Sequence, residues 1–353
     1  MEESKLVIDF HTHAFHDRIA EWVIESLMES SKDACEPCSD GTVGGLIKNM
    51  DEFGVDISVV QPIVTTPKNA MIQNKWAKEI TCERIISFGS FHPESEDYKK
   101  DIDLISELGL PGIKFHPEFQ KFYIDDPKMF KMYDYALSKG LMLLFHAGYD
   151  PSFPPPIHTS PNQFAEISKE MKGGIIIAAH LGGHSQWDDV EKHLVGTNVY
   201  LDTSMGMKHY PHDQFVRIVK NHGADKILFG SDSPWTKADE EIEMLNSLPL
   251  SQEEKDDIDE IVKEESHVKQ NEEKVDEMLT KSNWIIDGNY INNALKRFEE
   301  CDTVYFLDIN RFVCLHSVLK RHRTYKGKYR ASRSLYCDEK ITKDTTIKYK
   351  TEG

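Results

Sequence analysis

The 353-residue chain has little positive charge, few cysteines and no long apolar run. Its 42 Lys and Arg residues face 60 Asp and Glu residues, which gives a formal net charge of −18. Because charge of this sign repels phosphates, the sequence argues against a binder of nucleic acids or of anionic membrane surfaces. No uninterrupted apolar run approaches the length that spans a bilayer, so we expect no membrane segment.

The six cysteines do not suggest a disulfide framework in a chain of this length. Cys35 and Cys38 form a lone C-x-x-C pair in a stretch rich in Ser, Asp and Gly, a pattern typical of a surface loop. The first residues, Met1–Lys5, are acidic and do not resemble a cleavable leader. A reducing cytoplasm is therefore the expected location.

Short β-branched apolar runs alternate with amphipathic stretches from residue 4 to about residue 248. The runs predict eight strands, at Leu6–Phe10, Ile57–Pro62, Arg84–Phe91, Gly112–His116, Leu141–His146, Gly174–His180, Asn198–Thr203 and Lys226–Ser231. The amphipathic stretches predict helices, for example at Ile19–Met28, Pro127–Lys139, Asn162–Met171, Asp213–His222 and Lys237–Ser247. The alternation favours an α/β fold of the (β/α)8 TIM barrel type; an open doubly wound sheet is the alternative.

Polar residues at the ends of the apolar runs favour the barrel over the open sheet. The runs end repeatedly in a histidine or an acid: His11 and His13, then His116, His146, His180, Asp202 and Asp232. In a barrel, the carboxyl ends of all strands meet at one mouth, where catalysis takes place. In an open sheet, the same residues would be spread along a line.

A divalent metal site would use several of these side chains. Since side chains alternate along a strand, His11 and His13 face the same way. With His146 and Asp232 they make a set of three imidazoles and one carboxylate, which suits Zn²⁺ or another first-row ion and leaves a position for water. Asp232 could also accept a proton from that water, and His180 could act as a general base or bind a second metal.

Lys114 and His116 are the candidates for substrate binding. They lie on one face of the fourth predicted strand, so both can reach the mouth and bind an anionic group. The proline-rich stretch Phe153–His158 predicts either a stiff loop over the site or a simple rigid connection. His16 and Tyr149 could also line the pocket.

Five motifs resemble the amidohydrolase-related family of metal-dependent hydrolases, which are TIM barrels: Asp9-Phe10-His11-Thr12-His13, Gly112-Ile113-Lys114-Phe115-His116-Pro117-Glu118, Phe145-His146-Ala147-Gly148, Ala179-His180-Leu181-Gly182-Gly183 and Gly230-Ser231-Asp232-Ser233-Pro234-Trp235. They occur in the family's order, and the resemblance covers roughly residues 4–260. It implies that the catalytic metal, commonly zinc, is held by His11, His13, His146 and Asp232. It also implies that His180 is the acid/base histidine. Lys114 could instead carry the modification that bridges two metals in some amidohydrolases.

The resemblance implies an enzyme that acts on a small organic substrate. The leading hypothesis is hydrolysis of a C–N or C–O bond by a metal-activated water at the barrel mouth, with His180 and Asp232 as the catalytic residues. Because the family also contains non-oxidative decarboxylases, the alternative is decarboxylation of a small carboxylated substrate on the same metal site. Homo-oligomer formation stays open.

The composition changes after residue 250, where Glu, Asp and Lys dominate. Ser251–Glu254 could cap one more helix. We expect a barrel at residues 1–262, a linker at 263–272, a further α/β segment at 273–345 and a frayed tail at 346–353.

The stretch at about 273–340 resembles part of an adenylate-kinase-like P-loop protein of the DNA topology modulation type. The resemblance rests on Trp284–Tyr290, Val304–Asp308 and Leu319–Arg323. The chain has no G-x-x-x-x-G-K-[ST] motif, so the loop that cradles phosphates is missing and we assign no nucleotide-binding residues. The alternative from another class is a protein that binds nucleotides through this segment, or an inactive fusion with a kinase remnant.

Overall fold

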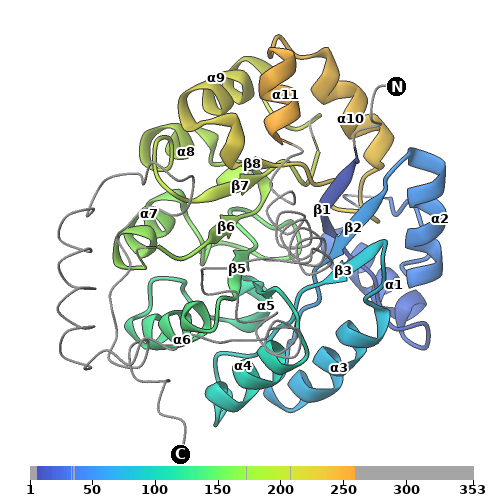
Figure 1. The fold of residues 1–353 in the computed structure, drawn as a ribbon, viewed down its shortest axis with the longest axis vertical. Helices are drawn as coiled ribbons and strands as arrows, with labels where there is room; N and C mark the ends of the chain where they lie inside the picture. Colours follow the sequence, from blue (N-terminus) through green and yellow to red (C-terminus); the bar gives the residue numbers. More distant parts are fainter. Residues whose placement is uncertain (1–5, 33, 35, 172, 207, 259–353) are drawn as a thin grey trace, which may run out of the picture. The chain divides into compact units, whose positions relative to one another are not determined.

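The computed structural model describes residues 6–32, 34, 36–171, 173–206 and 208–258 (Figure 1). They belong to one compact unit, Met1–Val262. The linker, the kinase-like segment and the tail that we predict from residue 263 onward lie outside the described residues. In the described ranges, no helix has both the length and the apolar character needed to cross a membrane.

Among the described residues, eight parallel strands form the centre of the fold, and each corresponds to a predicted run. The first three pair in order: β1 (Ile8–Thr12), β2 (Ile57–Val60) and β3 (Ile85–Ser87). The next five do the same: β4 (Gly112–Phe115), β5 (Met142–Phe145), β6 (Ile176–Ala178), β7 (Tyr200–Asp202) and β8 (Ile227–Leu228).

Two short contacts close these ladders into a barrel. Between β3 and β4, Gly89 and Ile113 form a parallel bridge, and the Lys114 N–H donates to the Gly89 carbonyl at 2.8 Å. Between β8 and β1, Thr12 and Ser233 form a parallel bridge. The predicted (β/α)8 architecture is therefore confirmed, and the open doubly wound sheet is wrong.

Helices surround the strands (Figure 1). In chain order they are α1 (Ala20–Ser31), α2 (Val43–Phe53), α3 (Ala70–Ile80), α4 (Tyr98–Glu107), α5 (Pro117–Gln120), α6 (Pro127–Ser138), α7 (Pro161–Glu170), α8 (Trp187–His193), α9 (His212–His222), α10 (Ala238–Ser247) and α11 (Gln252–Ile258). Short 3-10 turns lie at η1 (Pro67–Asn69), η2 (His180–Gly182) and η3 (Ala224–Lys226). The five helices named from the sequence are present. Ser251 caps α11 as expected: its hydroxyl accepts from the Glu254 N–H at 3.1 Å, and the Glu254 carboxylate accepts from the Ser251 N–H at 2.6 Å.

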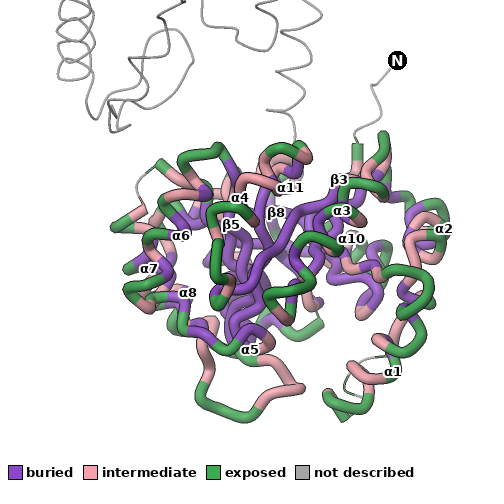
Figure 2. Tube along the Cα trace, turned by 90° about the horizontal axis from the view of Figure 1, so that it is seen from below, coloured by how far each residue is buried: buried purple, intermediate pink, exposed green. Residues whose placement is uncertain are grey.

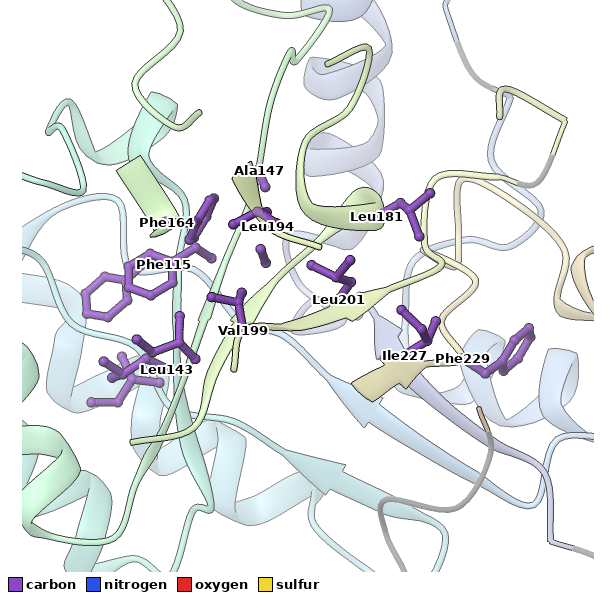
Figure 3. Close-up of a cluster of buried hydrophobic side chains, with 14 of the residues drawn as sticks. Phe115, Leu143, Ala147, Phe164, Leu181, Leu194, Val199, Leu201, Ile227 and Phe229 are labelled. Atoms are coloured by element: carbon purple, nitrogen blue, oxygen red, sulfur yellow. The ribbon is translucent and has the colours of Figure 1, made fainter. Parts of the chain in front are cut away.

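Apolar side chains fill the fold in two layers. The larger layer lies between strands and helices and includes the rings of Phe115 and Phe145 (Figure 3 labels Phe115). The smaller layer fills the barrel interior with Ile8, Phe10, Val59, Phe88, Leu144, Ile177, Ala179 and Leu228. On β6 the layers alternate, with Ile177 inside and Ile176 outside. The strands are therefore buried on both faces, whereas the helices keep an exposed face (Figure 2).

A bulge in β1 changes the direction of the residues that follow it. The register of β1 on β2 shifts by one residue between Asp9 and Thr12. Phe10 packs in the barrel interior, so strict alternation would turn His11 outward. The extra residue allows His11 to face inward as well, toward the other histidines at the barrel mouth.

The C-x-x-C stretch is more closely packed than a free surface loop. Cys38 is half-buried, its N–H donates to the Pro234 carbonyl at 2.7 Å and its thiol donates to the Thr236 carbonyl at 3.3 Å. Cys35 lies outside the described residues. The predicted surface loop is thus partly covered by the segment that follows β8.

Phe115 lies at the centre of a cluster of rings, and its removal should leave a large cavity. Its ring centroid lies 5.2 Å from that of Phe91, 5.8 Å from Phe122 and 5.0 Å from Phe145. We expect Phe115→Ala to lower the free energy of unfolding by about 3–5 kcal/mol in chemical denaturation. Phe130→Ala, in a half-buried position on α6, is the control and should cost less than half as much. Equal losses would contradict the central role of Phe115.

Candidate functional site

The carboxyl ends of the strands open into a cavity of about 520 Å³. All seven site residues predicted from the sequence line it: His11, His13, Lys114, His116, His146, His180 and Asp232. Tyr149 also lines the cavity, whereas His16 is exposed and not among the lining residues. The prediction that these strand ends meet at one mouth is therefore correct.

Three of the four predicted metal ligands form one group. The Nε2 atom of His13 lies 3.2 Å from Oδ1 of Asp232, and Nε2 of His11 lies 3.6 Å from the same oxygen. One ligand atom from each of the three residues falls within 4.8 Å of the others. We call His11, His13 and Asp232 the first ligand group.

Backbone hydrogen bonds between β8 and β1 bring this group together. The Asp232 N–H donates to the His11 carbonyl at 2.8 Å, and the His13 N–H donates to the Ser233 carbonyl at 2.6 Å. Asp232 adopts a positive φ of 70°, a conformation that Asp tolerates better than most residues. A side chain at Gly230 would place its Cβ 2.8 Å from the Cβ of His11, so glycine makes room for this ring.

The hydrogen bonds of the two imidazoles determine which nitrogen of each ring carries no proton. Nδ1 of His11 lies 2.8 Å from a carboxylate oxygen of Asp202, and Nδ1 of His13 lies 3.0 Å from the Gln61 carbonyl. Both partners accept, so each Nδ1 carries the proton and each Nε2 keeps its lone pair toward Asp232. Fixing the far nitrogen in this way is how proteins orient metal-binding histidines. The residues present therefore fit a divalent ion.

Burial keeps the imidazoles of the site neutral. It lowers the pKa of His11, His146 and His180 well below the ordinary value, with neighbouring positive groups adding to the effect. Neutral rings offer lone pairs to a cation and can take up a proton during a reaction.

Lys114, predicted from the sequence to bind substrate, contacts the first ligand group. Its Nζ donates to Nε2 of His11 at 3.0 Å, and its side chain is almost fully buried. Burial lowers the pKa of Lys114 to about 8, while Asp202 and Asp232 act in the opposite direction. The ammonium group therefore lies beside the donor atoms that would hold an ion.

His146, the fourth predicted ligand, contacts residues outside the first ligand group. Its ring stacks on His116 with centroids 4.1 Å apart, and its Nδ1 lies 3.0 Å from Nε2 of His180. His116 in turn places Nε2 3.2 Å from Oδ2 of Asp150. His116, His146 and Asp150 form a second ligand group, again with one ligand atom from each within 4.8 Å of the others.

Three residues that shape this site have no role that the sequence predicts. The sequence marks Asp202 only as a strand end, whereas in the structure its Oδ2 accepts from His11 and its Oδ1 accepts from the His180 N–H at 2.9 Å. Asp150 follows His146 by four residues in a loop, where no periodicity signals its direction. Ser204 places its hydroxyl 2.9 Å from Nδ1 of His180, a contact for which the sequence carries no signal.

The proline-rich stretch is held by a buried acid. Oε1 of Glu118, on α5, accepts from the His158 N–H at 2.7 Å. Phe153 packs on Phe119 with ring centroids 4.8 Å apart, and the preceding Pro151 lines the cavity. The segment between β5 and α7 thus contributes Tyr149–Ser152 to the cavity wall, whereas none of Phe153–His158 is among the lining residues, so the stiff loop over the site stays a prediction.

A profile of the amidohydrolase family matches residues 8–259 of the chain. The chain belongs to this family. It is accordingly an enzyme of the metal-dependent amidohydrolase superfamily, which includes decarboxylases. The kinase-like stretch at about 273–340 lies beyond the matched residues and stays a prediction.

Solved structures share the fold of this amidohydrolase at low sequence identity. An uncharacterized TIM-barrel protein from Bordetella bronchiseptica is 16% identical over 75% of this chain and 99% of its own, with a TM-score of 0.59. A 5-carboxyvanillate decarboxylase from Novosphingobium aromaticivorans, complexed with manganese and 4-hydroxy-3-methoxy-5-nitrobenzoic acid, is 14% identical over 75% and 96%, with a TM-score of 0.54. A probable 2-pyrone-4,6-dicarboxylic acid hydrolase from Acinetobacter baumannii is 16% identical over 72% and 96%, with a TM-score of 0.50. No curated protein matches the chain significantly.

Asp202 should increase the affinity for a metal ion, because its carboxylate orients the ring of His11. We expect Asp202→Asn to weaken the binding of Zn²⁺ or Mn²⁺ by about 10- to 100-fold, because the amide no longer fixes the His11 tautomer as the carboxylate does. Isothermal titration calorimetry on the metal-stripped protein measures this. The exposed Asp189→Asn on α8 is the matched control and should bind metal like the parent protein. Parental affinity in Asp202→Asn would exclude the positioning role.

His184, beside the cavity, should make folding stability depend on pH. Burial, assisted by His209, lowers the pKa of His184 to about 4. Since an unfolded histidine titrates near ~6.5, the unfolded state binds the extra proton between these values, and stability is lost as the pH falls through this window. We expect His184→Gln to remove up to about 1.4 kcal/mol per pH unit from the slope of unfolding free energy between about pH 6 and 4. Chemical denaturation of the metal-free proteins measures both slopes; identical slopes would contradict the assignment.

Proposed function

We propose that the chain is a metal-dependent hydrolase that cleaves a C–N or C–O bond of a small organic substrate at the barrel mouth. The observation that carries the proposal is the pair of imidazoles in the first ligand group, whose Nδ1 protons are held by Asp202 and Gln61 while both Nε2 atoms face Asp232. A set of imidazole and carboxylate ligands suits Zn²⁺, which we propose as the ion. His146 was predicted from the sequence as a fourth ligand of this ion.

The ion and the chain supply different parts of the chemistry. When bound, a divalent ion acts as a Lewis acid and lowers the pKa of a coordinated water. Asp232 accepts a proton from the attacking water, and His180 holds its Nε2 ready to take up or return a proton. This nitrogen carries no proton, because Nδ1–H of His180 donates to the Ser204 hydroxyl, which itself donates to Asp202; Nε2 lies 3.0 Å from Nδ1 of His146. In hydrolysis the water oxygen bonds to carbon, the C–N or C–O bond breaks, and the departing atom receives the proton.

The size and lining of the cavity are suited to a small substrate that carries an anionic group. Its volume of about 520 Å³ is in the range of small-molecule sites. Lys114 is a buried cation that lines the cavity, and His116, directly after β4, lines it as well with its ring beside Asp150. Apolar residues of α1, among them Val23 and Leu27, line another wall and can cover a hydrocarbon part.

Non-oxidative decarboxylation is the second candidate. A decarboxylase is among the structures that share the fold, and Lys114 offers a buried charge to a substrate carboxylate. In that reaction the C–C bond to the carboxylate breaks, CO₂ leaves, and the carbon takes a proton that His180 can deliver.

A substrate screen separates the two reactions. The metal-loaded protein is tested against small amides, lactones, esters and aromatic carboxylates, with CO₂ release scored apart from hydrolysis. We expect hydrolysis, and we expect His11→Ala and Asp232→Asn to lower both metal content and turnover, because each removes one ligand of the ion. Asp134→Asn, at an exposed position on α6, is the control. Full metal occupancy in both variants would overturn the ligand assignment, and CO₂ release alone would favour the decarboxylase.

A further inference from the structure

We propose that the face of α1 that lines the cavity is an acyl-chain subsite, and that the substrate is an amide or ester of a straight-chain fatty acid. This inference rests on the proposed function for the bond that is cleaved and on α1 for the subsite. Water adds its oxygen to the acyl carbon, the C–N or C–O bond breaks, and the amine or alcohol leaves with a proton. The chain-binding residues are Ile19, the N-cap of α1, and Trp22, Val23, Ser26 and Leu27.

The spacing of these five residues is that of the apolar stripe of an amphipathic helix. They follow one another at i, i+3, i+4, i+7 and i+8, the pattern with which a helix normally packs on a protein core. The buried residues of α1 are two others, Ala20 and Ile24. Ile24 packs closely on Gly41, where a Cβ would lie 2.8 Å from Cγ1 of Ile24. Since Ala20 and Ile24 hold the helix, its apolar stripe faces the cavity instead of the core.

The stripe stays partly exposed. Trp22 is 66% exposed and Ile19 is 47% exposed, whereas Val23 and Leu27 are half-buried. Most of α1 is accordingly coloured intermediate or exposed in Figure 2. Large apolar side chains that remain uncovered beside a cavity are typical of a binding site, because a ligand that covers them removes apolar surface from water. Trp22 and Ile19, as the most exposed members, form the outer end of the stripe.

The length of the stripe favours a chain over a single ring. At a rise of 1.5 Å per residue, Ile19 and Leu27 lie about 12 Å apart along the helix axis. An extended hydrocarbon chain can follow this length, whereas one aromatic ring covers little more than one helical turn of about 5.4 Å. The segment after β2 adds Pro62, Ile63 and Val64 to the lining of the same cavity, so the chain meets apolar side chains beyond α1 as well.

One cavity connects the stripe to the groups that act on the bond. His13 and Asp232 of the first ligand group line the cavity that α1 lines. Lys114 lines it too, and its buried ammonium offers a charge partner to the carboxylate of the fatty acid that hydrolysis releases. The Ser30 hydroxyl donates to Oγ of Ser152 at 3.0 Å, which fastens the last turn of α1 to the segment after β5. The helix is therefore held beside the barrel mouth.

Binding of straight-chain carboxylates tests the subsite without reference to activity. Butanoate, hexanoate and octanoate have the form of the acid that the reaction releases, and benzoate is the single-ring comparison. Each is titrated by calorimetry into the full chain, once metal-loaded and once metal-stripped, below the concentration at which octanoate forms micelles. We expect the affinity to rise about 5- to 15-fold for every two methylene groups added, because each covered methylene leaves water. We also expect octanoate to bind more tightly than benzoate.

Substitutions in the stripe should reduce this gain. We expect Trp22→Ser to remove most of the gain from hexanoate to octanoate and to leave the affinity for butanoate unchanged, because it shortens the outer end of the stripe. Leu27→Ala should also lower the gain with chain length. The control is Ile72→Ser on α3, since Ile72 is 72% exposed but is not among the lining residues, and it should bind every ligand like the parent protein. Thermal unfolding shows that the variants are folded, and Trp22→Ser suffices if Leu27→Ala is not.

Each result decides for or against the subsite. Equal affinity for the three chain lengths, or the same gain in the parent protein and in Trp22→Ser, would overturn it. Tighter binding of benzoate than of octanoate would also overturn it, in favour of a ring-shaped substrate. Self-association that Trp22→Ser abolishes without changing the chain-length gain would show that a second copy covers the stripe, and would overturn it too.

Failure of the proposed function gives a different result. The affinity of the metal-stripped protein for Zn²⁺ is measured separately by calorimetry. Any of the negative results above, in a protein that binds Zn²⁺, would overturn the subsite and leave the proposed function standing. A gain with chain length in a protein that binds no Zn²⁺ would overturn the proposed function and leave a chain-binding site.

Discussion

The hydrogen bonds that join the end of β8 to β1 bring Asp232 opposite His11 and His13, and the remaining parts of the site depend on this contact. Because the first and last strands of a barrel meet only when the sheet closes, the first ligand group exists only in the complete barrel. Gly230 makes the close approach sterically feasible, since a Cβ at that position would collide with His11. The same closure buries the site, and burial then controls its electrostatics.

Around this contact, burial and hydrogen bonding determine which ring nitrogens of the site's histidines carry a proton. The imidazoles of His11, His146 and His180 stay neutral because charging them inside the barrel is costly. Asp202 accepts from the ring of His11 and from the backbone of His180, so a single carboxylate orients residues from two strands. Proton positions therefore follow in sequence from Asp202 through Ser204 and His180 to His146, whose Nε2 is buried and has no hydrogen-bond partner among the described residues. The arrangement is preorganised rather than adaptable.

The comparisons establish the family and the fold, while the chemistry is a property of these side chains. Structures with 14–16% identity share the barrel, and the names they carry include both a decarboxylase and a hydrolase. A barrel supports such different reactions because its loops and strand ends vary independently of its core. In this chain, the segment between β5 and α7 supplies Asp150 and a wall of the cavity, and α1 supplies an apolar wall.

The sequence by itself determined the strands and the seven polar residues at their ends, and it favoured the barrel over an open sheet, because hydrophobic alternation and the position of a residue at a strand end are local features. It did not determine which of these seven residues belong to the first ligand group and which to the second. Alternation predicted correctly that His11 and His13 share a face, but only the bulge in β1 turns that face inward. Likewise, the pairing of His146 with His116 and Asp150, and the approach of Lys114 to His11, depend on rotamers and on contacts between strands distant in sequence. Such contacts have no periodicity along the chain, so only the tertiary structure decided them.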